Sequence, residues 1–192
     1  AEVNESLAAA ELQYRGKVAV RHPLDVLVND IGLERVRAGV QRPLNGLRVA
    51  CYYGCQLVRP FPVFDRDRDP QTMDQILKAA GAEVLDWPLK TRCCGGSLSG
   101  TIRDVGIRLS FHLLKEAKRR GADVIATACP LCQFNLECHQ RTMEREYGER
   151  VDLPVAFFTQ ILGLALGLPG KDLGLQRLFR PLEPVVAARS AE

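Results

Sequence analysis

Short apolar runs alternate along this chain with longer segments of helical periodicity, and this alternation restricts the possible folds more than any other feature. The apolar runs lie at residues 46–53, 82–86, 122–128 and 155–158. The run at 122–128, Ala-Asp-Val-Ile-Ala-Thr-Ala, is apolar almost throughout, as in a parallel strand that is buried on both faces. Strands that alternate with helices form an open, mostly parallel sheet. We therefore expect a Rossmann-like α/β fold with helices flanking the sheet.

Helical periodicity is clearest over residues 102–120, where apolar side chains recur every three to four positions and Gly121 follows. Pro130 stands near the start of another expected helix, a position that proline favours. Further helices are expected at residues 1–13, 24–31, 71–80, 130–147 and 159–168, with a short strand at 18–20 and a loop-like end from 169.

The chain divides into three expected parts. Residues 1–45 form a helical and linker segment, residues 46–170 form the α/β domain, and residues 171–192 form a C-terminal tail. The opening helix has neither an N-cap nor a Met before it, so we interpret residues 1–45 as the end of a longer pattern.

Composition excludes several classes of protein. The chain has 192 residues, 46% of them hydrophobic and 26% charged, which is typical of a soluble globular protein. The net charge is +3 and the Arg residues are scattered, so no nucleic-acid-binding face is expected. No apolar run reaches the ~18 residues of a transmembrane helix, and no signal peptide is visible. We expect a cytoplasmic protein without a transmembrane segment.

The chain contains seven cysteines, and they are its most informative residues for function. Seven is odd, so the cysteines cannot all pair in internal disulfides, and the chain is long enough to fold without such links. In a chain without a secretory signal, cysteines in close pairs indicate metal or redox chemistry.

Five of the cysteines follow three of the expected strands. Cys55 comes after the first run, Cys93 and Cys94 after the second, and Cys129 and Cys132 after the third, with spacers of 37 and 34 residues. In open parallel sheets, ligands bind beyond the carboxyl ends of the strands. We therefore expect all five thiols at one edge of the sheet.

The residues beside these cysteines suit metal ligation. Gly54 and Gly95 let the backbone approach a bulky group and offer N–H donors. The C-x-x-C of Cys129 and Cys132 opens a helix, whose N-terminus favours thiolate charge. Zinc takes four ligands, and adjacent cysteines rarely supply two of them, so an iron–sulfur cluster is favoured. A zinc site and a set of redox thiols stay open as alternatives.

The other candidate residues have plainer interpretations. Cys51 lies within a strand as a small buried residue, and Cys138 faces away from Cys132 on the same helix. His22 is expected to cap a turn, His112 to be a core or rim residue, and His139 to be solvated. Charged and polar side chains near the cysteines suit either structure or contact with a cluster or anionic substrate, namely Arg59, Arg92, Arg103, Asn135 and Thr101.

The order Cys, long spacer, Cys-Cys-Gly, long spacer, C-x-x-C resembles the CCG-domain (cysteine-rich domain) family. Residues 53–60, 93–101 and 129–136 are similar to the second CCG domain of the catalytic subunit of heterodisulfide reductase, and so are the flanks at 22–27 and 154–167. The resemblance covers most of the chain and is specific to the C-terminal half of that catalytic subunit.

The resemblance implies a non-cubane [4Fe-4S] cluster with catalytic ligands at Cys55, Cys93, Cys94, Cys129 and Cys132, next to Gly54 and Gly95. It implies an oxidoreductase that cleaves a small-molecule thiol disulfide reductively as part of a complex. The implied partners are a cubane iron–sulfur electron-donor subunit, a flavin-containing subunit and a first CCG domain. Only one CCG motif is present, so residues 1–45 are expected to be the tail of such a first domain.

Two other functions fit the same resemblance or the bare cysteine pattern. The first is an electron-transfer subunit of a glycolate or lactate oxidase, or of a succinate dehydrogenase or fumarate reductase. The second is a zinc-stabilised assembly module without enzymatic activity. The sequence does not identify the disulfide, the direction of the reaction, the electron donor or the proton donor.

Overall fold

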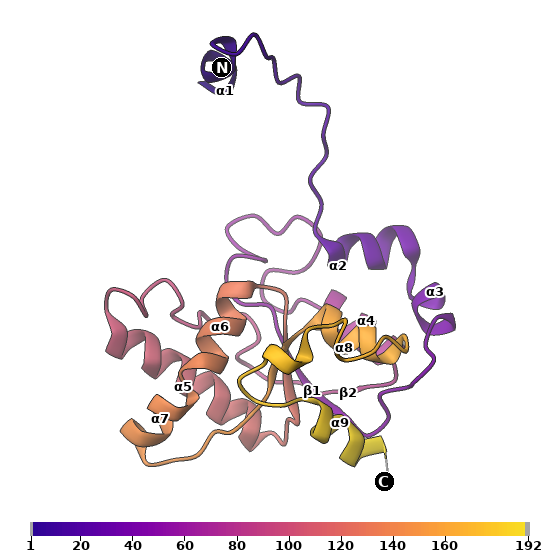
Figure 1. Cartoon of the computed structure of the whole chain (residues 1–192), viewed down its shortest axis with the longest axis vertical. Coiled ribbons are helices and arrows are strands. Elements are labelled where there is room, and N and C mark those ends of the chain that lie inside the picture. Colours follow the sequence, from indigo (N-terminus) through magenta and orange to yellow (C-terminus); the bar gives the residue numbers. More distant parts are fainter. Residues whose placement is uncertain (1, 191–192) are drawn as a thin grey trace.

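A computed structural model describes residues 2–190 and contains a four-stranded sheet (Figure 1). The strands are β1 (Arg48–Tyr52), β2 (Glu83–Val84), β3 (Val124–Thr127) and β4 (Val155–Phe157), and they pair in the order β2-β1-β3-β4. All three pairings are parallel, with Val49 opposite Val124 and Ile125 opposite Val155. The expected α/β fold with a parallel sheet is confirmed.

Helices cover both faces of this sheet (Figure 1). On one face lies the longest helix, α5, together with α6 and α7; on the other lie α4 and α8. The helical elements are α1 (Glu2–Ala8), α2 (Pro23–Asp25), η1 (Val26–Ile31), α3 (Leu33–Ala38), α4 (Thr72–Ala79), α5 (Arg103–Arg119), α6 (Pro130–Cys138), α7 (Gln140–Tyr147), α8 (Phe158–Ala165), η2 (Leu175–Arg177) and α9 (Glu183–Ser190). None of these helices combines the length and apolar character needed to cross a membrane.

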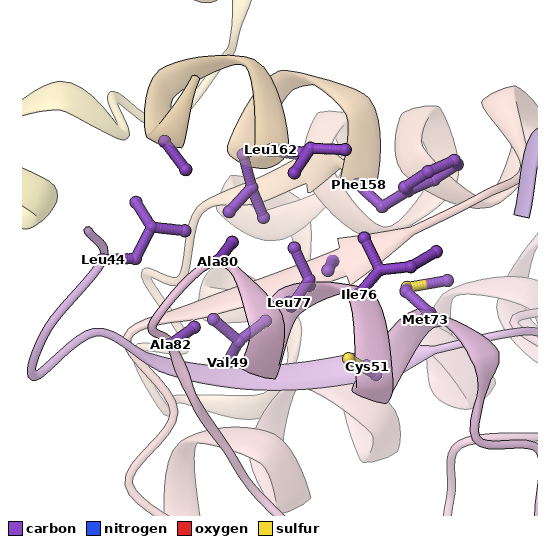
Figure 2. Packing of buried hydrophobic residues seen from close by; sticks show 14 of the residues in the cluster. Leu44, Val49, Cys51, Met73, Ile76, Leu77, Ala80, Ala82, Phe158 and Leu162 are labelled. Carbon is purple, nitrogen blue, oxygen red and sulfur yellow. The ribbon is translucent and has the colours of Figure 1, made fainter. Parts of the chain in front are cut away.

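The side chains of β1 and the residue after it alternate between two buried clusters. Val49, Cys51 and Tyr53 pack on the side of α4 and α8, whereas Ala50 and Tyr52 pack on the side of α5. This period of two is what a strand buried on both faces requires. Figure 2 shows Cys51 among apolar side chains of the first cluster, and the residue is fully buried. The interpretation of Cys51 as a small core residue is confirmed.

One expected strand is shorter than the sequence indicates, and one expected helix is interrupted. The strand expected at 82–86 pairs only over Glu83–Val84. The helix expected at 130–147 is interrupted at His139, which has non-helical backbone angles. The buried side-chain amide of Gln140 donates to the Leu136 and Leu153 carbonyls at 3.1 and 2.7 Å and accepts from the Leu153 backbone N–H at 3.1 Å. This tertiary anchor separates α6 from α7.

Both ends of the described chain also depart from expectation. Helix α1 ends at Ala8 rather than near residue 13, and residues 18–20 form no strand. Figure 1 shows α1 at the end of an extended segment. The expectation of a loop-like C-terminal end was wrong, because it contains η2 and α9. The Arg189 guanidinium on α9 donates to both Asp123 carboxylate oxygens at 3.0 and 2.8 Å, which fastens the end of the chain to the start of β3.

Glu137, on α6, is a buried carboxyl that holds the C-terminal segment against the domain. It accepts the backbone N–H of Arg180 at 3.1 Å and that of Phe179, and it is 4% exposed. Burial raises the pKa of Glu137 to about 7. The folded state therefore binds a proton at Glu137 more tightly than the unfolded state does. This proton stabilises the folded chain at low pH, and its contribution to the free energy of unfolding is lost as the pH rises through that pKa.

We expect the stability of the chain to fall by on the order of 2 kcal/mol between about pH 5 and about pH 8 because of this group. Glu137→Gln should keep both backbone hydrogen bonds and remove most of this dependence. Urea unfolding at the two pH values measures it. An equal pH dependence in the wild type and in Glu137→Gln would contradict the assignment.

Candidate metal centre

All five cysteines that the motif singles out line one cavity at the carboxyl ends of the strands. Its volume is about 320 Å³, and its walls come from the segments after β1, β2 and β3. The thiols are those of Cys55, Cys93, Cys94, Cys129 and Cys132. Cys51 and Cys138 are not among the residues that line it. The expected convergence of five thiols, with two cysteines apart, is what the fold produces.

The Cys93-Cys94 turn directs backbone donors at its own sulfurs. The Gly95 N–H points to Cys93 Sγ at 3.3 Å, and the Gly96 N–H points to Cys94 Sγ at 3.3 Å. Successive N–H groups of this kind form a concave site for negative charge. The turn therefore favours the thiolate form of Cys94, the form in which cysteine binds metal.

Two glycines allow this close packing. Gly95 has φ +77°, and a Cβ there would lie 2.8 Å from Gly106 Cα on α5. Gly54 has φ +70°, and a Cβ there would lie 3.3 Å from Cys132 Sγ. Side chains rarely adopt such positive φ values. Gly95 therefore brings backbone against α5, where a side chain has no room, and Gly54 brings backbone against the Cys132 sulfur, where a Cβ would be a tight contact.

Cys94 and Cys132 form a close thiol pair. Their sulfurs are 3.5 Å apart, with both side chains buried. A hydrogen bond from the Cys132 thiol, with a further donor from the Gly96 N–H, lowers the pKa of Cys94 to about 6. The Cys132 thiol donates this hydrogen bond, and the bond, together with burial, raises the pKa of Cys132. These donors thus favour the thiolate form of Cys94.

The remaining thiols occupy the rim of the cavity. Cys129 is the N-cap of α6, and Pro130 is its first residue, as the sequence indicates. Cys55 and Cys93 are neighbours whose thiols interact, and burial first, then the charge of Cys93, raises the pKa of Cys55. The raised pKa values of Cys55 and Cys132 mean that metal binding must displace a proton from each.

The carbonyl of Cys94 is fixed by two buried side chains. Ser110 Oγ of α5 and Asn135 Nδ2 of α6 each donate to it at 2.8 Å. Asn135 Oδ1 has no hydrogen-bond partner among the described residues. Asn135 therefore holds the backbone of Cys94 in place. The Thr101 hydroxyl, by contrast, donates to the nearby Leu98 carbonyl at 3.4 Å.

His22 also lines the cavity, which the sequence did not indicate. Its Nδ1 accepts the Leu24 N–H at 3.1 Å, which confirms the expected cap, and its other ring nitrogen donates to the Ala128 carbonyl. Burial lowers the pKa of His22, so the ring is neutral. It ties the segment before α2 to the loop that carries Cys129.

The arginines near the cysteines are engaged elsewhere. Arg59 donates to the Thr91 carbonyl, and Arg103 pairs with Glu146 at 3.2 Å. Of the described residues, those that line the cavity include no Lys or Arg. These contacts favour the structural interpretation of Arg59 and Arg103 over direct contact with an anionic substrate.

The shape of the thiol set discriminates between kinds of metal site. Across residues 2–190, no three His, Cys, Asp or Glu side chains are placed to hold one metal ion together. The five thiols instead surround a volume of about 320 Å³. A tetrahedral zinc ion needs four ligands around one point, whereas a polynuclear cluster takes thiolates spread around its faces. The donor set fits an iron–sulfur cluster.

Comparison with known proteins identifies similar sequences. The chain is 31% identical over 176 residues to a protein named 8-methylmenaquinol:fumarate reductase membrane anchor subunit from Wolinella succinogenes, covering 91% of this chain and 61% of that protein. It is also 31% identical to a subunit of the ferredoxin/F(420)H(2)-dependent CoB-CoM heterodisulfide reductase of Methanosarcina acetivorans, covering 91% of this chain and 59% of that protein. The chain thus spans about 60% of the length of these relatives.

A solved structure supports the fold. The crystal structure of a hypothetical protein from Helicobacter pylori matches with a TM-score of 0.70 and 17% identity, covering 94% of this chain and 32% of that one. The family model of the cysteine-rich domain, CCG, matches residues 49–137, which contain all five cavity cysteines. Residues 49–137 thus match the CCG family of cysteine-rich domains.

Proposed function

We propose that this chain is the iron–sulfur subunit, or part of it, of a heterodisulfide reductase-like complex. In this proposal Cys55, Cys93, Cys94, Cys129 and Cys132 hold a non-cubane [4Fe-4S] cluster. The observation that carries the proposal is the convergence of these five thiols on one cavity at the strand ends. Similarity to the heterodisulfide reductase relative from Methanosarcina acetivorans supports the same function.

Such a cluster, when bound, supplies electrons and thiophilic iron to a disulfide. The residues of this chain prepare the place for it. Backbone N–H groups of Gly95 and Gly96 and the first turn of α6 stabilise thiolate charge. Leu57 and Leu131 add apolar surface to the cavity wall.

The proposed net reaction breaks the sulfur–sulfur bond of a small-molecule disulfide. The bond takes up two electrons from a reduced partner subunit and two protons from solvent, and two thiols are released. The electrons would come from a cubane iron–sulfur subunit, which would receive them from a flavin-containing subunit. A first CCG domain would complete the site that binds the disulfide. His22 binds with both ring nitrogens, so it is better suited to holding the cavity wall than to donating a proton.

A second function is electron transfer in a fumarate reductase-type complex. The chain is 31% identical to the Wolinella succinogenes protein and 31% identical to the Methanosarcina acetivorans protein. Sequence identity therefore supports electron transfer to fumarate as directly as it supports disulfide cleavage. In that case the same cysteines hold a cluster that passes electrons onward and binds no disulfide.

The two functions are separated by an assay on the complex that copurifies with the tagged full-length protein from its host. A reduced viologen dye serves as electron donor, and its oxidation is followed after addition of a disulfide or of fumarate. Disulfide-dependent oxidation that disappears in Cys94→Ser supports the first function. Oxidation with fumarate alone supports the second function and contradicts the first.

A further inference from the structure

Lys90 is a buried cation in the segment that leads to Cys93. Its side chain is 6% exposed, and its Nζ donates to the Asp74 carboxylate and to the Pro70 carbonyl, each at 2.9 Å. Burial alone would lower the pKa of Lys90, but the hydrogen bond and charge of Asp74 raise it, so the side chain is an ammonium. Asp74 on α4 is 5% exposed. Since a buried charge is costly unless paired, each partner fixes the position of the other.

Tyr53 connects this ion pair to the cavity. Its hydroxyl donates to Asp74 Oδ2 at 2.5 Å and accepts the backbone N–H groups of Met73 and Asp74 at 2.8 and 3.1 Å. The Lys90 ammonium lies 5.6 Å from the centre of the Tyr53 ring. Tyr53 lines the cavity and stands two residues before Cys55. The ion pair is thus one side chain away from the thiols.

The backbone joins the same two segments. Three successive carbonyls of residues 90–92 accept hydrogen bonds from donors within residues 52–59. The bonds are Tyr53 N–H and Gly54 N–H to Lys90 at 2.8 and 3.2 Å, Tyr52 hydroxyl to Arg92 at 2.6 Å, and the Arg59 guanidinium to Thr91. The segment that carries Cys93 is therefore docked along the segment that carries Cys55.

We propose that Lys90 is a positioning residue for the metal centre, which acts through Asp74 and Tyr53 to set the distance between the Cys55 and Cys93 thiols. Cys93 follows Lys90 by three residues, and Cys55 follows Tyr53 by two. The side-chain network holds both segments against α4, and the carbonyl bonds transmit that position to the two cysteines. The role of this thiol–thiol distance in metal binding rests on the proposed function. The distance itself can be tested in the chain without any cluster.

The test uses the full chain without any cluster, reduced, so its result does not depend on the proposed function. Phenylarsine oxide joins two neighbouring thiols through two arsenic–sulfur bonds and releases water. Digestion and mass spectrometry then identify which cysteines are bridged. In the wild type we expect bridging of Cys55 with Cys93 and of Cys94 with Cys132, because each pair is in contact.

We expect Lys90→Met, which keeps an unbranched side chain and removes the charge, to reduce Cys55–Cys93 bridging several-fold. Bridging of Cys94 with Cys132 should be unchanged, since α5 and α6 hold Cys94 separately. Lys115→Met is the matched control. Lys115 also lies over a ring, 5.7 Å from that of Phe111, and pairs with Glu149 at 2.6 Å, but its side chain is 48% exposed and lies on α5.

A milder variant covers the case in which Lys90→Met does not fold. Tyr53→Phe keeps the ring and the ion pair but removes the hydroxyl, and we expect it to weaken the same bridge selectively. Two results would overturn the proposal. One is unchanged bridging of Cys55 with Cys93 in the folded variants. The other is an equal loss of both bridges, which would mean that the network supports only the fold as a whole.

Discussion

Cys94→Ser is expected to lower the iron content of the anaerobically reconstituted chain several-fold. Cys94 is the buried thiol with the lowered pKa, it lies 3.5 Å from Cys132 Sγ, and its carbonyl is held by two side chains. Serine is nearly the same size, but its hydroxyl is a harder donor with a much higher pKa, so it is a poor ligand for iron. Iron is measured by colorimetric assay and compared with protein concentration.

The matched control for this variant is Cys138→Ser. Cys138 lies on α6, the helix that carries Cys132, but it is absent from the cavity wall. It should retain the iron content of the wild type. Equal iron in Cys94→Ser and wild type, or equal losses in both variants, would count against Cys94 as a ligand.

Gly95→Ala is expected to destabilise the cluster-free chain by about 2–4 kcal/mol and to lower its iron content after reconstitution. The added Cβ would lie 2.8 Å from Gly106 Cα and 3.1 Å from the Gly106 carbonyl oxygen, both backbone atoms that cannot move aside separately from α5. The positive φ of 77° adds backbone strain. Urea unfolding measures the stability.

Gly100→Ala provides the control within the same loop. A Cβ at Gly100 meets no atom within 4 Å, so its effect should stay within about 0.5 kcal/mol. A Gly95→Ala chain as stable as Gly100→Ala would show that the Cys93-Cys94 turn is not packed against α5 as described.

Local pattern was enough to predict the sheet and the convergence of the cysteines. β1, β3 and β4 are short and mostly apolar, and each cysteine group lies in the segment that follows a strand, so parallel pairing brings Cys55, Cys93 and Cys129 to one edge. The interpretation of Cys51 followed from the alternation of β1 in the same way. The ligand roles of the five cysteines rest on the family resemblance and on chemistry, and the experiments above test them.

The features that sequence did not reveal depend on contacts between distant residues. Helix α9 follows a Pro-punctuated segment, and the pairing of Arg189 with Asp123, 66 residues away, joins it to the domain. The break before α7 is set by Gln140 and Leu153. Lys90 and Asp74 are 16 residues apart on different elements, and neither stands in a motif, so no local signal marks them. Only the fold brings these partners together.

Metal and acid-labile sulfide analysis of the anaerobically purified protein decides whether the five thiols hold an iron–sulfur cluster. We expect iron and sulfide in nearly equal amounts, with both lost in a variant that carries serine at all five cavity cysteines. Stoichiometric zinc without sulfide in the wild type would contradict the cluster and would favour the assembly module instead.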